Sequence, residues 1–128
     1  MPYTPHGHHR NGSFASQKSQ WVISLNEEIA AYNNAWTKRW GTHQCFWGLH
    51  FTAAGIDVLG VSPAPDAHRL KIAKFVGDDR DNWHGYPVAH WLSPWDKPQE
   101  EILKAWKDAG LINGPTFSKI HRGKRCNL

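Results

Sequence analysis

The sequence predicts an α+β fold: a small antiparallel sheet of about three strands covered by helices, in the order (β)αβββ-loop-αα. Two periodicities predict it. Apolar residues recur at spacings of three and four over residues 25–40 and 96–110, which is typical of amphipathic helices. They alternate at a spacing of two over residues 43–52 and form short apolar runs at 56–61 and 70–76, as expected for strands. Short connections between these strands favour an antiparallel meander.

The length of 128 residues suits one domain with one core. The mean hydropathy of -0.62 is low for such a core, but the eight tryptophans compensate, because each ring can bury about 150–250 Å². Residues 1–19 are rich in Gly, Ser, Asn and His and show no periodicity. We therefore expect a flexible N-terminal arm over residues 1–19 and a single α+β domain over 20–128 with a basic C-terminal tail.

The helix at residues 25–40 has the clearest boundaries. Ser24 and Glu27 fit a capping box at its start, and Gly41 provides a stop. After the third strand, residues 77–97 show neither a helical nor a strand period, although several aromatic residues lie among them. We expect an ordered loop here that joins the two halves of the core.

The C-terminal part predicts two helices. Asp96 and Pro98 are placed to begin the first, Gly110 to end it, and Asn113 to begin the second. The pair resembles the end of a repressor-type helix-turn-helix, which would imply contact with DNA. However, Trp106 occupies a position where that motif needs a small residue, and the turn is one residue too long, so we expect a plain αα-hairpin.

The net charge of +4 is concentrated at the chain ends. The last sixteen residues contain no acid and four basic side chains: Lys119, Arg122, Lys124 and Arg125. We expect a non-enzymatic binding or regulatory protein that engages an anionic macromolecule, either nucleic acid or an acidic protein surface. These four residues and the 77–95 aromatic loop, with Trp83 and Tyr86, would form the contact. The alternative explanation for so small a charge is solubility alone.

The same loop also concentrates groups that can transfer protons or bind a metal. They are Asp78, Asp79, Asp81, His84 and His90. The alternative function is a small hydrolase, for example a nuclease, with its site in residues 77–91. In it His84 or His90 would act as acid or base with Asp79, and Lys71 or Arg80 would stabilise developing charge.

A metal in that alternative would be held by Asp78, Asp79, Asp81 and His84. The spacing matches no zinc or calcium motif, and Gly-Asp-Asp and Asp-Asn are also common turn formers that cap backbone amides. We favour binding over catalysis, because the spacing yields no complete catalytic constellation.

Composition limits the remaining classes. Two cysteines provide no disulfide framework, no cofactor motif is present, and no apolar run approaches the roughly 20 residues that cross a bilayer. We expect a cytoplasmic protein without a cofactor and without a membrane partner.

Overall fold

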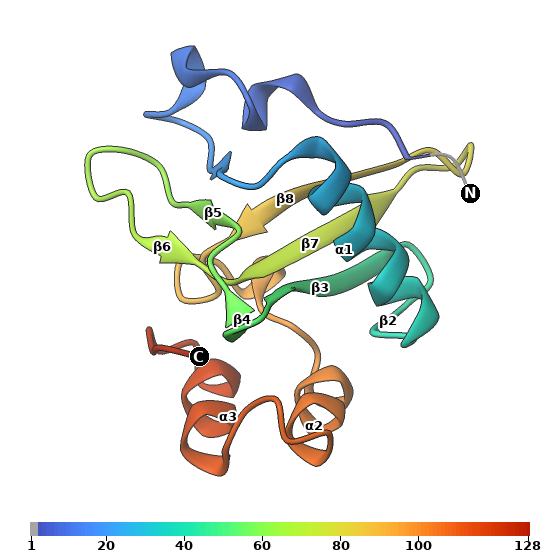
Figure 1. Ribbon diagram of the computed structural model, residues 1–128, viewed down its shortest axis with the longest axis vertical. Helices are drawn as coiled ribbons and strands as arrows, with labels where there is room; N and C mark the ends of the chain where they lie inside the picture. Colours follow the sequence, from blue (N-terminus) through green and yellow to red (C-terminus); the bar gives the residue numbers. More distant parts are fainter. Residues whose placement is uncertain (1–2) are drawn as a thin grey trace. The chain divides into compact units, whose positions relative to one another are not determined.

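The computed structural model describes residues 3–128 and divides into two compact units. The first ends at Val88 and contains the sheets and one helix, and the second, Ala89–Leu128, contains the other two helices (Figure 1).

The first unit contains two antiparallel sheets, so the prediction of one small three-stranded sheet is wrong, although the α+β class is right. The larger sheet has five strands in the order β2-β3-β7-β8, with β4 paired to β3. Its strands are β2 (Gly41–Thr42), β3 (Cys45–Thr52), β4 (Gly55–Asp57), β7 (Ile72–Gly77) and β8 (Trp83–Val88). The smaller sheet is formed by β1 (Gln20–Trp21), β5 (Gly60–Val61) and β6 (Arg69–Leu70), in the order β1-β5-β6.

The largest correction concerns the predicted loop at residues 77–97, because its first half forms the turn and the second strand of a β-hairpin. β8 pairs with β7 along its whole length, with Phe75 opposite Gly85 and Ile72 opposite Val88. The sequence pattern does not indicate this strand because it contains Gly85 and Pro87, and both residue types are rare in strand interiors. A side chain at position 85 would overlap the Phe75 ring, so the glycine is required by a neighbour that is distant in sequence.

The predicted strand at 56–61 is also divided. Ile56 pairs with Phe51 in the larger sheet, whereas Gly60 pairs with Trp21 and Leu70 in the smaller one. One continuous apolar run therefore contributes strands to two sheets. No local periodicity indicates where the first strand ends and the second begins.

Helix α1 (Leu25–Thr37) confirms the predicted capping box. The Glu27 amide donates to Ser24 Oγ at 3.1 Å, and the Ser24 amide donates to Glu27 Oε1 at 2.9 Å. The helix ends three residues earlier than expected, where Arg39 takes a left-handed φ of 57°. Ala31, Tyr32 and Ala35 form the buried face of α1, which lies across the larger sheet (Figure 1).

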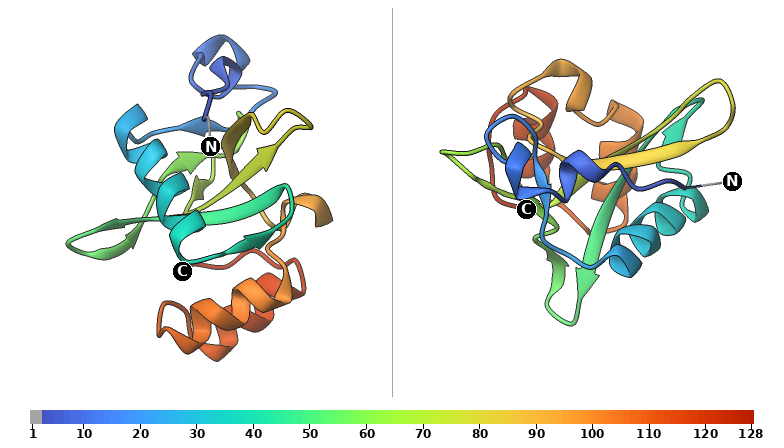
Figure 2. Two further views of the ribbon diagram at one scale, coloured as in Figure 1. Left: turned by 90° about the vertical axis from the view of Figure 1, so that its right-hand side faces the viewer. Right: turned by 90° about the horizontal axis from the view of Figure 1, so that it is seen from above.

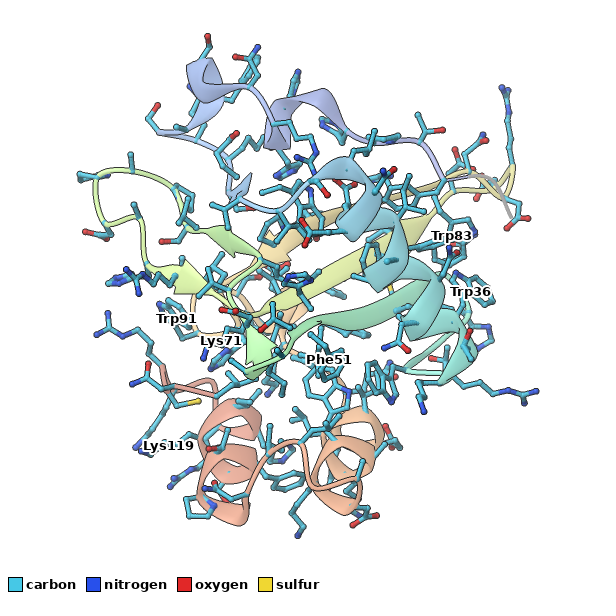
Figure 3. All side chains as sticks on the ribbon, viewed as in Figure 1. Trp36, Phe51, Lys71, Trp83, Trp91 and Lys119 are labelled. Atoms are coloured by element: carbon cyan, nitrogen blue, oxygen red, sulfur yellow. The ribbon has the colours of Figure 1, made fainter. Side chains whose placement is uncertain are left out.

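Aromatic rings fill the core of the first unit. Trp36 stacks on Phe46 with ring centroids 4.1 Å apart, and Trp83 meets Trp36 edge-on at 5.1 Å (Figure 3). Tyr32 contacts both Trp83 and Phe75. Trp83 is only 3% exposed, which places this predicted partner-binding ring inside the core.

Residues 3–19 belong to the first unit and contain two short 3-10 helices, η1 (Gly7–His9) and η2 (Gly12–Phe14). Tyr3 forms a parallel bridge with Trp83, and the Thr4 amide donates to the Trp83 carbonyl at 2.6 Å. Arg10 forms an ion pair with the buried carboxylate of Glu28. Flexibility of this segment in solution stays a prediction.

The second unit contains the 3-10 helix η3 (Pro94–Asp96), α2 (Glu100–Asp108) and α3 (Gly114–His121), with the last two packed side by side (Figures 1 and 2). Helix α2 begins after Gln99 rather than at Asp96, which instead belongs to η3. Its predicted stop is confirmed, because Gly110 has a φ of 75° and the Leu111 amide bonds the Trp106 carbonyl. Asn113 caps α3 through the Thr116 amide at 2.9 Å.

Candidate functional site

The acidic residues after β7 form the turn of the β7–β8 hairpin. Asp78 Oδ1 accepts hydrogen bonds from the amides of Arg80 at 2.8 Å and Asn82 at 2.9 Å. These amides hold the pKa of Asp78 below its usual value. Asp81 has a φ of 60°, and its Oδ1 accepts from the Trp83 indole nitrogen at 2.8 Å. Asp78 therefore stabilises the turn, and Asp81 anchors a core ring.

Asp79 and Arg80 are exposed at the tip of this turn and line an open hollow there. Lys71 lies elsewhere, between β6 and β7, where its charge acts on Asp57. Within residues 3–128, no three His, Cys, Asp or Glu side chains are arranged to hold a metal ion.

The two predicted acid-base histidines belong to different units. His84 lies on β8 in the first unit, and it lines an open hollow of about 400 Å³ together with His6 and Asp78. His90 lies in the second unit, where it is 3% exposed, and its Nε2 is 2.7 Å from the Lys124 carbonyl oxygen. Burial lowers the pKa of His90, so the neutral ring can donate to that carbonyl.

A histidine cluster centred on His6 brings His84 together with residues of the N-terminal segment, which the sequence did not predict. The His6 ring lies 4.7 Å from His8, 5.4 Å from His9 and 5.7 Å from His84, measured between ring centroids. His9 is buried, stacks on Tyr86 at 5.1 Å and places Nδ1 2.8 Å from the Ser19 carbonyl. Three of these histidines come from the N-terminal segment, whose path over β8 no local pattern indicates.

A second surface lies wholly in the second unit and is centred on Trp95. Trp95, in η3, is 81% exposed, and Leu92, three residues earlier, is 64% exposed. Ser93 caps η3 by accepting from the Trp95 amide at 3.3 Å. A tryptophan this exposed is unusual, because the ring normally gains most from burial.

Lys97 follows Trp95 by two residues and bonds to the basic end of α3. Its ammonium donates to the His121 carbonyl at 2.8 Å, at the last residue of α3. Beyond it, the Lys124 amide donates to the Lys119 carbonyl at 2.8 Å, and the Lys124 carbonyl binds His90. We give the name tryptophan-basic surface to residues in or near η3 and in or after α3: Leu92, Trp95, Lys97, Lys119, Arg122, Lys124 and Arg125.

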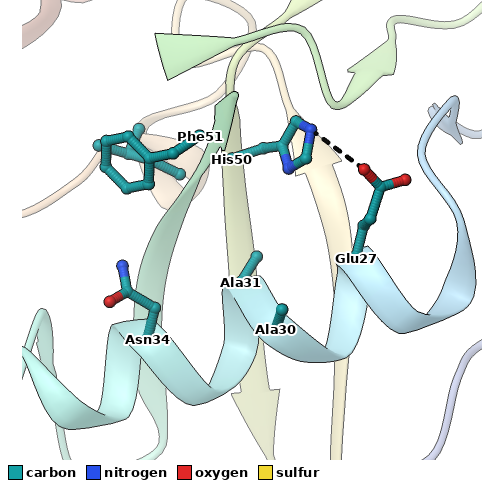
Figure 4. Close-up of a pocket in the computed structure, with 7 residues that line it drawn as sticks. Glu27, Ala30, Ala31, Asn34, His50 and Phe51 are labelled. Carbon is teal, nitrogen blue, oxygen red and sulfur yellow. Dashed lines mark ion pairs between the residues drawn. The ribbon is translucent and has the colours of Figure 1, made fainter. Parts of the chain in front are cut away.

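A third feature, also missed from the sequence, is a hollow of about 310 Å³ between α1 and β3 (Figure 4). In it His50 Nε2 lies 3.5 Å from Glu27 Oε2, and the pair sits beside exposed Phe51. The capping box and the strand alternation predict where Glu27 and His50 lie on their elements, but their pairing depends on how α1 crosses the sheet.

Comparisons of the chain with protein-family models, curated proteins and solved structures found no match. No helix within residues 3–128 is long and apolar enough to cross a membrane. Function is therefore inferred from the side-chain chemistry described above.

Proposed function

We propose that the protein is a non-enzymatic binding protein that engages single-stranded nucleic acid through the tryptophan-basic surface. The observation that supports this most is the 81% exposure of Trp95, two residues from Lys97, whose ammonium is bonded to the end of basic helix α3. Single strands bind to surfaces that combine basic side chains, which follow the phosphates, with aromatic rings on which bases stack.

In this proposal, the anionic partner that the sequence predicts binds to the second unit alone. Trp83 and Tyr86 are not part of the proposed surface, because Trp83 is buried and Tyr86 stacks on His9. An acidic protein would also be attracted by Lys119, Arg122 and Lys124, but it would not need an exposed aromatic ring for stacking. The tryptophan therefore favours unpaired bases.

The contribution of Trp95 can be tested by substitution. Base stacking on an aromatic side chain contributes about 1–3 kcal/mol per base, so Trp95→Ala should weaken binding roughly 5- to 150-fold. Fluorescence anisotropy of a labelled single-stranded oligonucleotide measures this change. Phe51→Ala is the matched control, because Phe51 is an exposed aromatic residue of the first unit and its removal should leave the affinity unchanged.

The basic residues can be tested through salt dependence. Neutralising three or four phosphates of a single strand gives a loss of roughly 20- to 50-fold between about 50 and 200 mM salt. The double variant Lys119→Gln/Lys124→Gln should flatten this dependence, whereas Lys18→Gln/Lys38→Gln removes two exposed lysines of the first unit and should not. Salt-independent binding, or equal effects of both double variants, would contradict the proposal.

The hydrolase alternative depends on His84, which shares its hollow with Asp78. Asp78 is already engaged by two amides of its own turn, so this alternative has less support. If it is correct, His84→Ala abolishes hydrolysis of a nuclease substrate while the protein remains folded.

A further inference from the structure

The N-terminal segment passes along β8 and is fixed to the first unit on both sides of η1 (Figure 1). Before η1, Tyr3 forms its parallel bridge with Trp83. After η1, Arg10 is paired with the buried carboxylate of Glu28. Between these two anchors, η1 is held against β8 by the His9 ring. This arrangement allows η1 to leave β8 while the residues on either side remain attached.

His6 caps the start of η1 with a ring nitrogen. Its Nδ1 accepts a hydrogen bond from the His8 amide, with a nitrogen-to-nitrogen distance of 3.3 Å. Only an unprotonated Nδ1 can accept, so the cap requires a neutral ring that carries its proton on Nε2. Protonation of His6 therefore removes the side-chain cap of η1.

His9 holds η1 to the strand. The ring is buried and stacks on Tyr86 at an interplanar angle of 17°, and its Nδ1 donates to the Ser19 carbonyl at 2.8 Å. Burial lowers the pKa of His9, and the bond to Ser19 offsets this only in part. A second proton would place a full charge in this buried position, so protonation favours the form in which His9 has left it.

Positive charges surround both rings. Burial, and then the charges of neighbouring cations, lower the pKa of His6. His84 and Lys18 act in this direction on His6 and on His9, and His8 acts on His6. Protonated rings at the short separations found in this cluster would repel one another.

The carboxylates near the segment are already engaged. Asp78 lines the hollow beside His6 and His84, but its Oδ1 accepts from two amides of its own turn. Glu28 is paired with Arg10 and accepts from the Tyr3 hydroxyl. Protonation of the histidine cluster would therefore add positive charge with little compensation.

We propose that mild acid releases η1 from β8 through protonation of His6 and His9. In neutral solution both rings are uncharged, His6 caps η1 and His9 stacks on Tyr86. As the pH falls through about 6.5, the released segment binds protons more readily than the docked one, so the docked population falls. Release uncovers Tyr86 and opens the hollow beside His84.

A nuclear Overhauser effect between the His9 and Tyr86 rings reports docking directly. We expect it at about pH 7.5 and expect its loss by about pH 5, because two histidines let the ratio of released to docked segment rise by up to about a hundredfold per pH unit. Hydrogen exchange in the same samples tests whether the rest of the unit stays folded. The paired amides of β7 and β8 should remain protected throughout.

Two variants of His6 separate its charge from its cap. His6→Asn keeps an acceptor for the His8 amide, as Asn11 provides at η2, but removes one titrating ring. It should move the midpoint of the loss by about half a pH unit or more toward acid. His6→Ala removes the cap at every pH and should weaken the effect already at about pH 7.5. His121→Asn, an exposed position of the second unit, is the control and should leave the midpoint unchanged.

Three results would overturn the proposal. The first is a His9–Tyr86 effect that persists at about pH 5 after both rings have taken up protons. The second is the same midpoint in the wild type and in His6→Asn. The third is a loss that coincides with exposure of the β7 and β8 amides, because the unit would then unfold as a whole rather than release η1.

Discussion

Arg10 holds the N-terminal segment to the core through a buried ion pair, and its removal should be costly. The Glu28 side chain is 1% exposed and accepts from Arg10 Nε at 2.9 Å and Nη2 at 2.8 Å. The Tyr3 hydroxyl also donates to Glu28, and Arg10 Nη1 donates to the Ile23 carbonyl at 2.9 Å. Burial, and then the bond to Glu28, raise the pKa of Tyr3, so its hydroxyl stays protonated as a donor.

Arg10→Ala would leave the Glu28 carboxylate buried without its cation. Breaking a buried pair by removing one partner costs about 3–5 kcal/mol, a large part of a typical total stability of about 5–15 kcal/mol. We expect the urea midpoint, followed by tryptophan fluorescence, to fall accordingly with little change in slope.

Two further variants test the reasoning. Arg69→Ala removes an exposed arginine of β6 and should change stability by less than about 0.5 kcal/mol. The double replacement Arg10→Met/Glu28→Leu removes both charges and should recover part of the loss, because apolar pairs of similar volume often replace buried ion pairs without cost, whereas the Tyr3 hydroxyl loses its acceptor. A loss of less than about 1 kcal/mol for Arg10→Ala would refute the claim that this pair anchors the segment.

Three other perturbations have defined outcomes. Burial lowers the pKa of His9 and His90 below 6.5, so the unfolded chain binds more protons than the folded protein in mildly acidic solution. The free energy of unfolding should therefore be constant above about pH 6.5 and fall below it. Each histidine contributes at most about 1.4 kcal/mol per pH unit to this fall. Unfolding free energies between about pH 8 and 5 measure this, and a flat profile would contradict it. Gly85→Ala should destabilise by about 1–3 kcal/mol through overlap with Phe75, as thermal unfolding would detect. Asp78→Ala should speed hydrogen exchange of the Arg80 and Asn82 amides, and unchanged protection would mean that the carboxylate does not cap the turn.

Sequence patterns predict the parts of this fold that depend on local interactions. The capping box of α1, the glycine stop of α2 and the cap of α3 each involve residues within five positions of one another. The positions of Glu27 and Asn113 could therefore be predicted, because helix termini impose the same hydrogen-bond needs everywhere.

What the sequence could not predict depends on distant partners. Gly85 is required by the Phe75 ring, so β8 has the composition of a loop although it pairs along its whole length. Trp95 has the same residue type as buried Trp83, and only the tertiary structure separates an exposed ring from a core ring. Residues 77–95 therefore looked like one site, although they contribute to two units.

The tertiary structure likewise determines which predicted site residues meet. His84 lies beside His6 from the N-terminal segment, while His90 bonds the Lys124 carbonyl. The Glu27–His50 pair depends on the crossing of α1 over β3, which no spacing along the chain determines.

The most direct test of the central claim compares a single strand with its own duplex as ligands for the wild-type protein and Trp95→Ala. Stacking on Trp95 requires unpaired bases, so the wild type should bind the single strand at least about tenfold more tightly than the duplex, and Trp95→Ala should lose most of that preference. Equal affinity for both forms, or a preference that survives Trp95→Ala, would contradict the assignment of the tryptophan-basic surface to single-stranded nucleic acid.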